Sequence, residues 1–452
     1  MPLPRLLLPA LFLAAAGGLG AAVVGANPPA LSLTEQRVEA LPAGERAAWL
    51  GYLERSRRQH AADQAAVAAE LKAAGLAQPV MPPEGFGRGT MPLDRPAEWY
   101  GSDDARQTAD AIVSYQLPNG GWGKNLAMRG HVRKPGESFI ANNLSRYLGP
   151  DDYDAPHDRY WNYFGTLDND ATTTQLRFLA RVVTAAGPEK GAAYARAFLR
   201  GIGYLLAAQY PNGGWPQVWP LEGGYHDAIT INDNAVDQAI EVLQGAAEGQ
   251  APYAFVPAQL RPKAAAAAER GIACLLACQV RAGGRLTVWC QQHDPLTLQP
   301  TSARNFEPPA LCSEESAHVL EFFMSLPRPS PAVAASVRAG AAWLKASAIY
   351  GMAWERSRGP RRGPGAAAPA APGRPPAFVS RLVPAPGAGP IWARYYDPAT
   401  GRPVFGDRDK TVHDQVTDLS AERQRGYQWY GDAPKAALEE YAAWSARHPA
   451  AP

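Results

Sequence analysis

A five-residue motif, Pro-Asn-Gly-Gly-Trp, occurs twice in the chain, at residues 118–122 and 211–215. Asn-Gly-Gly favours a tight turn, because glycine adopts positive φ without a Cβ clash and asparagine tolerates the left-handed region. Each turn follows a helical pattern in which an apolar residue precedes a glutamine by four positions. These residues are Ile112 and Gln116 in the first copy, and Leu205 and Gln209 in the second. A repeated unit of this kind predicts an array of similar parts.

A third copy lies further along the chain in altered form: Leu275 precedes Gln279 by four positions, and Gly283, Gly284 and Trp289 follow. Residues 341–354 read as a weaker fourth copy. Other helical patterns lie between the copies, at residues 172–187, 235–249 and 316–326. Two alternating classes of helix predict hairpins arranged around an axis. We therefore expect an all-α protein, a partial (α/α) toroid of helical hairpins with a turn-rich, short-strand segment near the C-terminus.

The tryptophans of the turns allow two interpretations. Trp122 and Trp215 either close the ends of their helices or stack on a carbohydrate ligand. The glycine-rich turns should gather at one end of the toroid, where loops build binding sites.

The N-terminal residues indicate export. Arg5 precedes an apolar run rich in small residues, which is typical of a secretory signal peptide; a membrane anchor is the alternative. We expect a protein secreted to the periplasm or the extracellular space. The expected segments are a signal peptide (1–26), an N-terminal helical extension (27–95), the first part of the catalytic toroid (96–355), a disordered insertion rich in arginine, proline, glycine and alanine (356–390), and the C-terminal part of the catalytic domain (391–452).

The charge balance excludes one class of partner. The formal net charge is +2, from 44 basic and 42 acidic side chains, which gives no electrostatic case for nucleic acid binding. No feature points to a protein partner, and we expect a monomer. Export would permit disulfides among Cys274, Cys278, Cys290 and Cys312, but buried thiols and one or two bridges both remain open.

Acidic and amide residues precede two helices of the second class. Asp168, Asn169 and Asp170 come before one helix, and residues 232–234, Asn-Asp-Asn with Asp233 at the centre, come before another. Such residues are favoured as N-caps, because a side-chain oxygen accepts the unpaired helix N–H groups. Three in a row exceed what one cap requires, and oxygen ligands from two helix starts would suit calcium.

Three arginines form a second group of candidates. Arg304 precedes a Pro-Pro pair, and Arg394 and Arg408 lie in a turn-rich segment with aromatic neighbours. Arginine binds planar carboxylates in a bidentate fashion. Acidic oxygens combined with arginines indicate an anionic substrate bridged by a metal ion.

These motifs together carry a resemblance. The ordered set NGGWGKN, TLDNDAT, YPNGGWPQVWP, ITINDNA, ARNFEPPAL and WARYYD, followed by RPVFGDRD and GYQWYG, resembles the family-ten pectate lyases over about residues 100–446. The resemblance implies a secreted enzyme that cleaves α-1,4-linked polygalacturonate by calcium-assisted β-elimination in a central cleft of an (α/α) toroid. The long insertion departs from the compact form expected of the family.

The resemblance also implies roles for single residues. Arg304 matches the arginine taken as the catalytic base, and Asp168 and Asp233 match the acidic positions around calcium. The substrate-binding positions are Asn169, Lys124, Arg394 and Arg408. A neutral guanidine is rare below pH 12, so a base arginine would need burial and neighbouring cations to lower its pKa. Arg304 as the base and Arg304 as a carboxylate ligand both remain open.

Two other functions fit parts of the sequence. The spacing of glutamine and tryptophan is similar to the QW repeats of triterpene cyclases, which are also α-toroids, but the acidic D-x-D-D-type motif of those enzymes is missing and the export signal does not fit. A non-catalytic pectin-binding protein is the second alternative. Formation of unsaturated products distinguishes a lyase from both.

Overall fold

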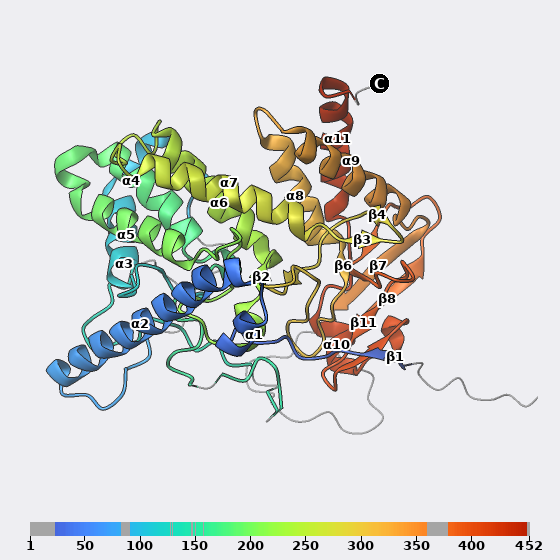
Figure 1. Ribbon diagram of the computed structural model, residues 1–452, viewed down its shortest axis with the longest axis horizontal. Coiled ribbons are helices and arrows are strands. Elements are labelled where there is room, and N and C mark those ends of the chain that lie inside the picture. The colour runs from blue at the N-terminus through green and yellow to red at the C-terminus, as the bar shows by residue number, and fades with distance from the viewer. Residues whose placement is uncertain are drawn as a thin grey trace, which may run out of the picture.

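In the computed structural model of the protein, the described residues are 23–82, 91–126, 128, 130–145, 148–149, 151–156, 158–358 and 378–449. Figure 1 shows α3 to α7 on one side of the molecule and the strands of the C-terminal part on the other. The helices are α1 (Glu35–Glu39), α2 (Ala43–Ala74), α3 (Asp103–Ser114), α4 (Thr173–Lys190), α5 (Ala192–Ala208), α6 (Ala235–Glu248), α7 (Arg261–Cys278), α8 (Ser313–Ser325), α9 (Pro331–Ala346), α10 (Ala421–Gly426) and α11 (Ala433–Arg447). The strands are β1 (Val23–Ala26), β2 (Ile229–Thr230), β3 (Arg281–Ala282), β4 (Arg285–Leu286), β5 (Gln292–His293), β6 (Leu311–Cys312), β7 (Met352–Arg358), β8 (Phe378–Pro384), β9 (Trp392–Ala393), β10 (Tyr395–Tyr396), β11 (Phe405–Gly406), β12 (Thr411–His413) and β13 (Tyr430–Gly431).

The helices pack as hairpins, as the repeat predicts. Helix α4 packs on α5, α6 packs on α7, and α8 packs on both α9 and α11. The helices of the first class, α3, α5, α7 and α9, also contact one another in that order. The strands are short and antiparallel, and the three-stranded sheet has the order β1-β12-β11.

A tryptophan and a glutamine fix the turn of each copy. In the first copy, the indole N–H of Trp122 donates to the carbonyl oxygen of Ile112 at 2.8 Å. The side-chain amide of Gln116 donates to the carbonyls of Gly120, at 2.7 Å, and Ala197, at 2.8 Å. Gly120 belongs to the turn, whereas Ala197 lies on α5, the next helix of the same class. The glutamine therefore joins one repeat to the next.

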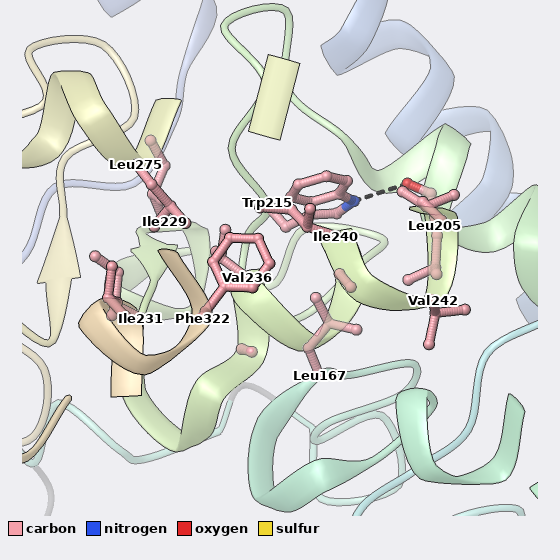
Figure 2. Close-up of a cluster of buried hydrophobic side chains, with 14 of the residues drawn as sticks. Leu167, Leu205, Trp215, Ile229, Ile231, Val236, Ile240, Val242, Leu275 and Phe322 are labelled. Carbon is pink, nitrogen blue, oxygen red and sulfur yellow. Dashed lines mark hydrogen bonds between the residues drawn. The ribbon is translucent and has the colours of Figure 1, made fainter. Parts of the chain in front are cut away.

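The second and third copies make the same bonds. Figure 2 shows the indole of Trp215 directed at the carbonyl of Leu205 within the apolar core. The tryptophans are fully buried, so they cannot stack on a sugar, and the interpretation as structural residues is correct. The donor and acceptor pairs are Trp215 to Leu205, Gln209 to Gly213 and Ala267, Trp289 to Leu275, and Gln279 to Thr287 and Ser336.

The glycines of the turns permit close packing against the next helix. Gly120 and Gly213 have φ angles of 96° and 94°, which L side chains rarely adopt. A Cβ atom on Gly120 would lie 2.5 Å from the carbonyl oxygen of Arg200, and one on Gly213 would lie 2.2 Å from that of Arg270. A side chain at either position would push the repeats apart.

The fourth copy contains an inserted hairpin. The indole N–H of Trp392 donates to the carbonyl of Leu344 on α9 at 2.7 Å, so Trp392 completes the copy that begins in residues 341–354. Strands β7 and β8 lie between the two residues and pair over seven positions. Residues 378–384 thus form a strand where the sequence predicted disorder, because their apolar and β-branched residues suit strand pairing. The centre of that predicted insertion, residues 359–377, lies outside the described residues.

The N-terminal residues pack into the same core as the toroid. Leu33, Trp49 and Tyr52 belong to the main apolar cluster, and the Tyr52 hydroxyl donates to the carbonyl of Ala208 at the end of α5. Residues 1–22 of the predicted signal peptide lie outside the described residues, and its last four residues form β1. Within the described part of the chain, no helix combines the length and apolar character needed to cross a membrane.

The cysteines, all of which the structure describes, are buried and carry free thiols. This agrees with the first of the two alternatives that the sequence left open.

Candidate active site

A polar cavity of about 510 Å³ lies where the N-terminal ends of α4, α6 and α8 meet the C-terminal segment. Two series of positions supply much of its lining. The first series lies two residues after the buried tryptophan of each copy and consists of Lys124, Gln217, Gln291 and Arg394. The second series lies at the starts of the second-class helices and consists of Asp168, Asn169, Asn232, Asp233 and Glu314. The repeat therefore places both series around one cavity.

The two acidic segments have the same unusual backbone. Asn169 and Asp233 occupy equivalent positions and both have a φ angle of 53°. The residue after each, Asp170 or Asn234, is also left-handed, with φ of 63° or 58°. Non-glycine residues with positive φ are strained and concentrate at functional sites.

The N-cap interpretation of these segments is wrong. The N-cap residues of α4 and α6 are Thr172 and Asn234, and neither side chain makes a capping hydrogen bond. The side chains of Asp168, Asn169, Asp170, Asn232 and Asp233 make other contacts instead.

Asp168 is buried among donors. Lys124 Nζ donates to its Oδ2 at 2.5 Å, and Gln217 Nε2 donates to its Oδ1 at 2.9 Å. Burial disfavours a charged carboxylate, but Lys124 outweighs that effect, so the pKa of Asp168 lies below its ordinary value. Asp168 is therefore ionised at neutral pH.

Asp233 lies beside Asp168 and shares a donor with it. Asn232 Nδ2 is 3.0 Å from Asp233 Oδ2 and 3.5 Å from Asp168 Oδ1. The backbone N–H of Asn169 also points at Asp233 Oδ2, at 3.4 Å. The two helix starts thus bring two carboxylates together, as the sequence predicted.

Arg304 faces the cavity in a bidentate ion pair. Its Nε and terminal NH2 donate to the two carboxylate oxygens of Glu307 at 2.9 and 2.5 Å. The Tyr427 hydroxyl donates to the same carboxylate at 2.7 Å. The Arg304 side chain is 40% exposed, whereas that of Glu307 is 4% exposed.

The ion pair sets both charge states. Partial burial alone would lower the pKa of Arg304, but the Glu307 carboxylate outweighs it and holds that pKa above its ordinary value. Burial alone would raise the pKa of Glu307, but Arg304 outweighs it and lowers that pKa to about 2. The guanidinium is therefore charged over the whole ordinary pH range in this arrangement.

Arg394 also lies in the cavity lining, over the Tyr427 ring at 5.0 Å. It forms ion pairs with Glu315 and, at 3.4 Å, with Glu314. Arg408 does not line the cavity: it donates to Glu422 at 2.8 Å and approaches Asp152 at 3.9 Å. Six of the seven predicted site residues thus come together, and Arg408 lies beyond them.

Sequence reasoning missed several lining residues. Glu314 lies in the first turn of α8, so its position in the second helix class was a signal that could have identified it. Glu307 lies three residues after Arg304 in a quoted motif, but nothing local predicts their ion pair. Asp154 and Tyr427 come from distant loops.

The charges of the cavity favour a bridging cation. Among the described lining residues, five carboxylates (Asp154, Asp168, Asp233, Glu307 and Glu314) face three cationic side chains (Lys124, Arg304 and Arg394). The described part of the chain shows no metal-binding group of three or more histidine, cysteine or acidic side chains. Asp168 and Asp233 offer hard oxygen donors, but calcium takes six to eight oxygens. The pair therefore suits calcium only if substrate carboxylates and water complete the shell.

Known structures resemble this fold over most of the chain. Family 10 polysaccharide lyase from Cellvibrio cellulosa is 30% identical, with a TM-score of 0.61, over 79% of this chain and 99% of that one. A mutant of family 10 polysaccharide lyase from Cellvibrio cellulosa, in complex with trigalacturonic acid, is 29% identical, with a TM-score of 0.60, over 81% of this chain and 100% of that one. A search of curated proteins returned no match.

The helical toroid and its cavity, taken with these matches, define a polysaccharide lyase. The sequence model described as pectic acid lyase matches residues 116–438, and the chain belongs to that family. Its activity is that of a pectate lyase, and its substrate is polygalacturonate. The predicted fold class and family resemblance are thereby confirmed, and the triterpene-cyclase and non-catalytic alternatives are not supported.

Proposed function

We propose that this cavity cleaves polygalacturonate by calcium-assisted β-elimination. One observation carries the proposal: Arg304, Arg394 and the Asp168–Asp233 pair come from separate segments and line one cavity. Arginines and a carboxylate pair are the groups needed to bind a polyanion and a cation together.

Asp168 and Asp233 would hold the calcium ion, with the uronate carboxylate and water as further ligands. When bound, calcium supplies positive charge that stabilises the negative charge developing on the substrate. Without a cation, the excess of carboxylates in the cavity would repel the polymer. Lys124 donates to Asp168 in the same place, and we propose that it contacts the substrate when the ion is bound.

The elimination breaks one C–H bond and one C–O bond of the substrate. The C5–H bond of the uronate unit breaks and its electron pair forms the C4–C5 double bond. The C4–O4 bond breaks, and its electron pair leaves with the oxygen, which is then protonated. We propose Arg304 as the group that removes the C5 proton. Because Glu307 holds the pKa of Arg304 high, this role requires alkaline conditions and a weakened ion pair.

The other predicted residues are proposed to bind substrate. Arg394 lies in the cavity and would bind a uronate carboxylate. Asn169 Nδ2 donates to Asn125 Oδ1 at 3.0 Å, and it lies close enough to Asp233 to contact the same sugar. Arg408 would bind a more distant uronate, since it lies beyond the cavity lining. We also propose that the protein is exported and acts as a monomer, with the N-terminal apolar run as the sequence basis for export.

Product analysis tests the mechanism. De-esterified polygalacturonate incubated with the full chain should yield oligomers with an unsaturated non-reducing end, detected by ultraviolet absorbance and mass spectrometry. Exhaustive chelation should abolish the reaction, and added calcium should restore it. Saturated products would show that the enzyme hydrolyses the polymer and does not carry out elimination. Full activity after chelation would show that calcium takes no part in the mechanism.

A further inference from the structure

The N-terminal segment lies against the loops that carry the site. Strand β1 pairs with β12, with Val23 opposite His413 and Ala26 opposite Thr411, and the backbone N–H of Asn27 donates to the carbonyl of Lys410 at 2.8 Å. Figure 1 shows this blue segment running from the red C-terminal strands to α1 and α2. It lies outside the residues that the family model matches, 116–438.

The side chain of Asn27 contacts the backbone of the catalytic loop. The side chain is buried, with the residue 2% exposed, and its Nδ2 donates to the carbonyl oxygens of Arg304 at 3.0 Å and Asn305 at 2.8 Å. The carbonyl of Asn27 accepts a hydrogen bond from the Tyr153 hydroxyl at 2.8 Å. One amide side chain therefore holds two successive peptide units of the loop.

Asn305 extends this junction to two further loops. Its Oδ1 accepts from the backbone N–H of Tyr153 at 2.9 Å, and its Nδ2 donates to the carbonyl of Arg408 at 2.8 Å. On the other side of Arg304, the Ser302 hydroxyl donates to the carbonyl of Pro28 at 2.5 Å. The N-terminal segment thus contacts the loop both before and after the arginine.

This placement affects the guanidinium through the loop backbone. The hydrogen-bonding partner of Arg304 is Glu307, which lies on the same loop three residues later. The ion pair therefore moves as a unit with the loop backbone. Contacts between the backbone and the rest of the protein, those of Asn27 included, determine where the guanidinium stands relative to Asp168 and Asp233.

We propose that Asn27 is a positioning residue that sets the location of Arg304 in the cavity. This inference rests on the proposed role of Arg304. The predicted cleavage of the signal peptide after residue 26 would remove β1 but leave Asn27, whose side chain contacts the loop without β1. Because small displacements of a reacting group lower the rate strongly, loss of the amide should reduce kcat about 10- to 100-fold with little change in KM.

The experiment compares variants of the full chain. Asn27→Ala removes both donors, and Asn27→Asp keeps the size but replaces the donating amide with a carboxylate. Leu31→Ala is the control, because that side chain lies on the same segment and is 61% exposed. We would measure kcat and KM on polygalacturonate well below the melting temperature of each variant, together with hydrogen exchange of residues 302–307.

Both Asn27 variants should lose kcat and exchange faster in residues 302–307, while Leu31→Ala matches the wild type. A purely structural role would lower the melting temperature but leave kcat of the folded protein unchanged, and that result would overturn the proposal. Unchanged exchange in Asn27→Asp would also overturn it. A wild type without lyase activity would instead overturn the proposed function, and hydrogen exchange would still decide whether Asn27 holds the loop.

Discussion

The buried tryptophans and the residues two positions after them differ in what they contribute. Trp122, Trp215, Trp289 and Trp392 are all fully buried, and each indole donates to a helix carbonyl at 2.7 to 2.8 Å. Two residues later, the side chains are lysine, glutamine, glutamine and arginine, and all four line the cavity. The repeat thus keeps the same tryptophan at one position, where it stabilises the fold. Two positions later it carries different side chains, which give the cavity its chemistry.

Residues that stabilise the fold and residues that serve the chemistry are thus only two positions apart in the chain. Changes to the tryptophans should alter folding and leave the chemistry of the folded protein intact. Changes in the cavity should alter the chemistry and leave folding largely intact, since these polar side chains are not part of the apolar core.

The largest effect should come from Arg304→Lys. Lysine keeps the positive charge but loses the planar guanidinium, so a group that acts only in the transition state would be lost. We expect kcat to fall roughly 10²- to 10⁴-fold, the usual contribution of a general base, at saturating polygalacturonate. A circular-dichroism melt close to that of the wild type would confirm that the variant is folded. A normal kcat with a raised KM would show that Arg304 only binds substrate.

Two variants in the second copy of the repeat test whether the buried tryptophan serves stability and the residue two positions later serves the chemistry. Trp215→Ala should lower the free energy of unfolding by about 3–5 kcal/mol, because it empties a large buried volume and removes the bond to Leu205. Gln217→Ala should change stability much less but lower kcat/KM, since Gln217 holds Asp168. Denaturant unfolding and steady-state kinetics measure the two effects. Equal losses of stability in both variants would contradict the separation.

The smallest expected effect concerns the pH dependence of the rate. Removing the Glu307 carboxylate should lower the pKa of Arg304, because that carboxylate is what holds it high. If neutral Arg304 is the base, the alkaline rise of kcat/KM in Glu307→Gln should begin at lower pH than in the wild type. Glu315→Gln is the matched control, since Glu315 pairs with Arg394. An unshifted rise in Glu307→Gln would favour Arg304 as a charged ligand.

Local sequence patterns predicted the repeated parts of the fold. A glutamine, a glycine turn and a tryptophan make contacts within about ten residues, so the repeat that contains Gln116 and Trp122 could be recognised from the sequence, although the role of Trp122 stayed open. The acidic segments were found because they recur before two helices. Their use as caps could not be judged from sequence, since Asp233 and Asn169 have left-handed backbones that only tertiary contacts maintain.

Contacts between distant residues that do not belong to the repeat could not be predicted. The bond from Asn27 to the carbonyl of Arg304 spans 277 residues. Tyr427 reaches Glu307 across 120 residues, and this contact adds to the ion pair that fixes the charge of Arg304. No periodicity or spacing records such bonds. The sequence therefore predicted which residues form the cavity better than it predicted their charge states.

Calcium binding in the presence and absence of substrate tests the central claim most directly. Because only Asp168 and Asp233 are proposed to hold the ion, calorimetry should show weak calcium binding to the protein alone and much tighter binding with trigalacturonic acid present. Asp233→Ala should abolish this coupling, and Asn27→Ala should retain it. Tight calcium binding that is independent of the sugar, or coupling that survives in Asp233→Ala, would contradict the account.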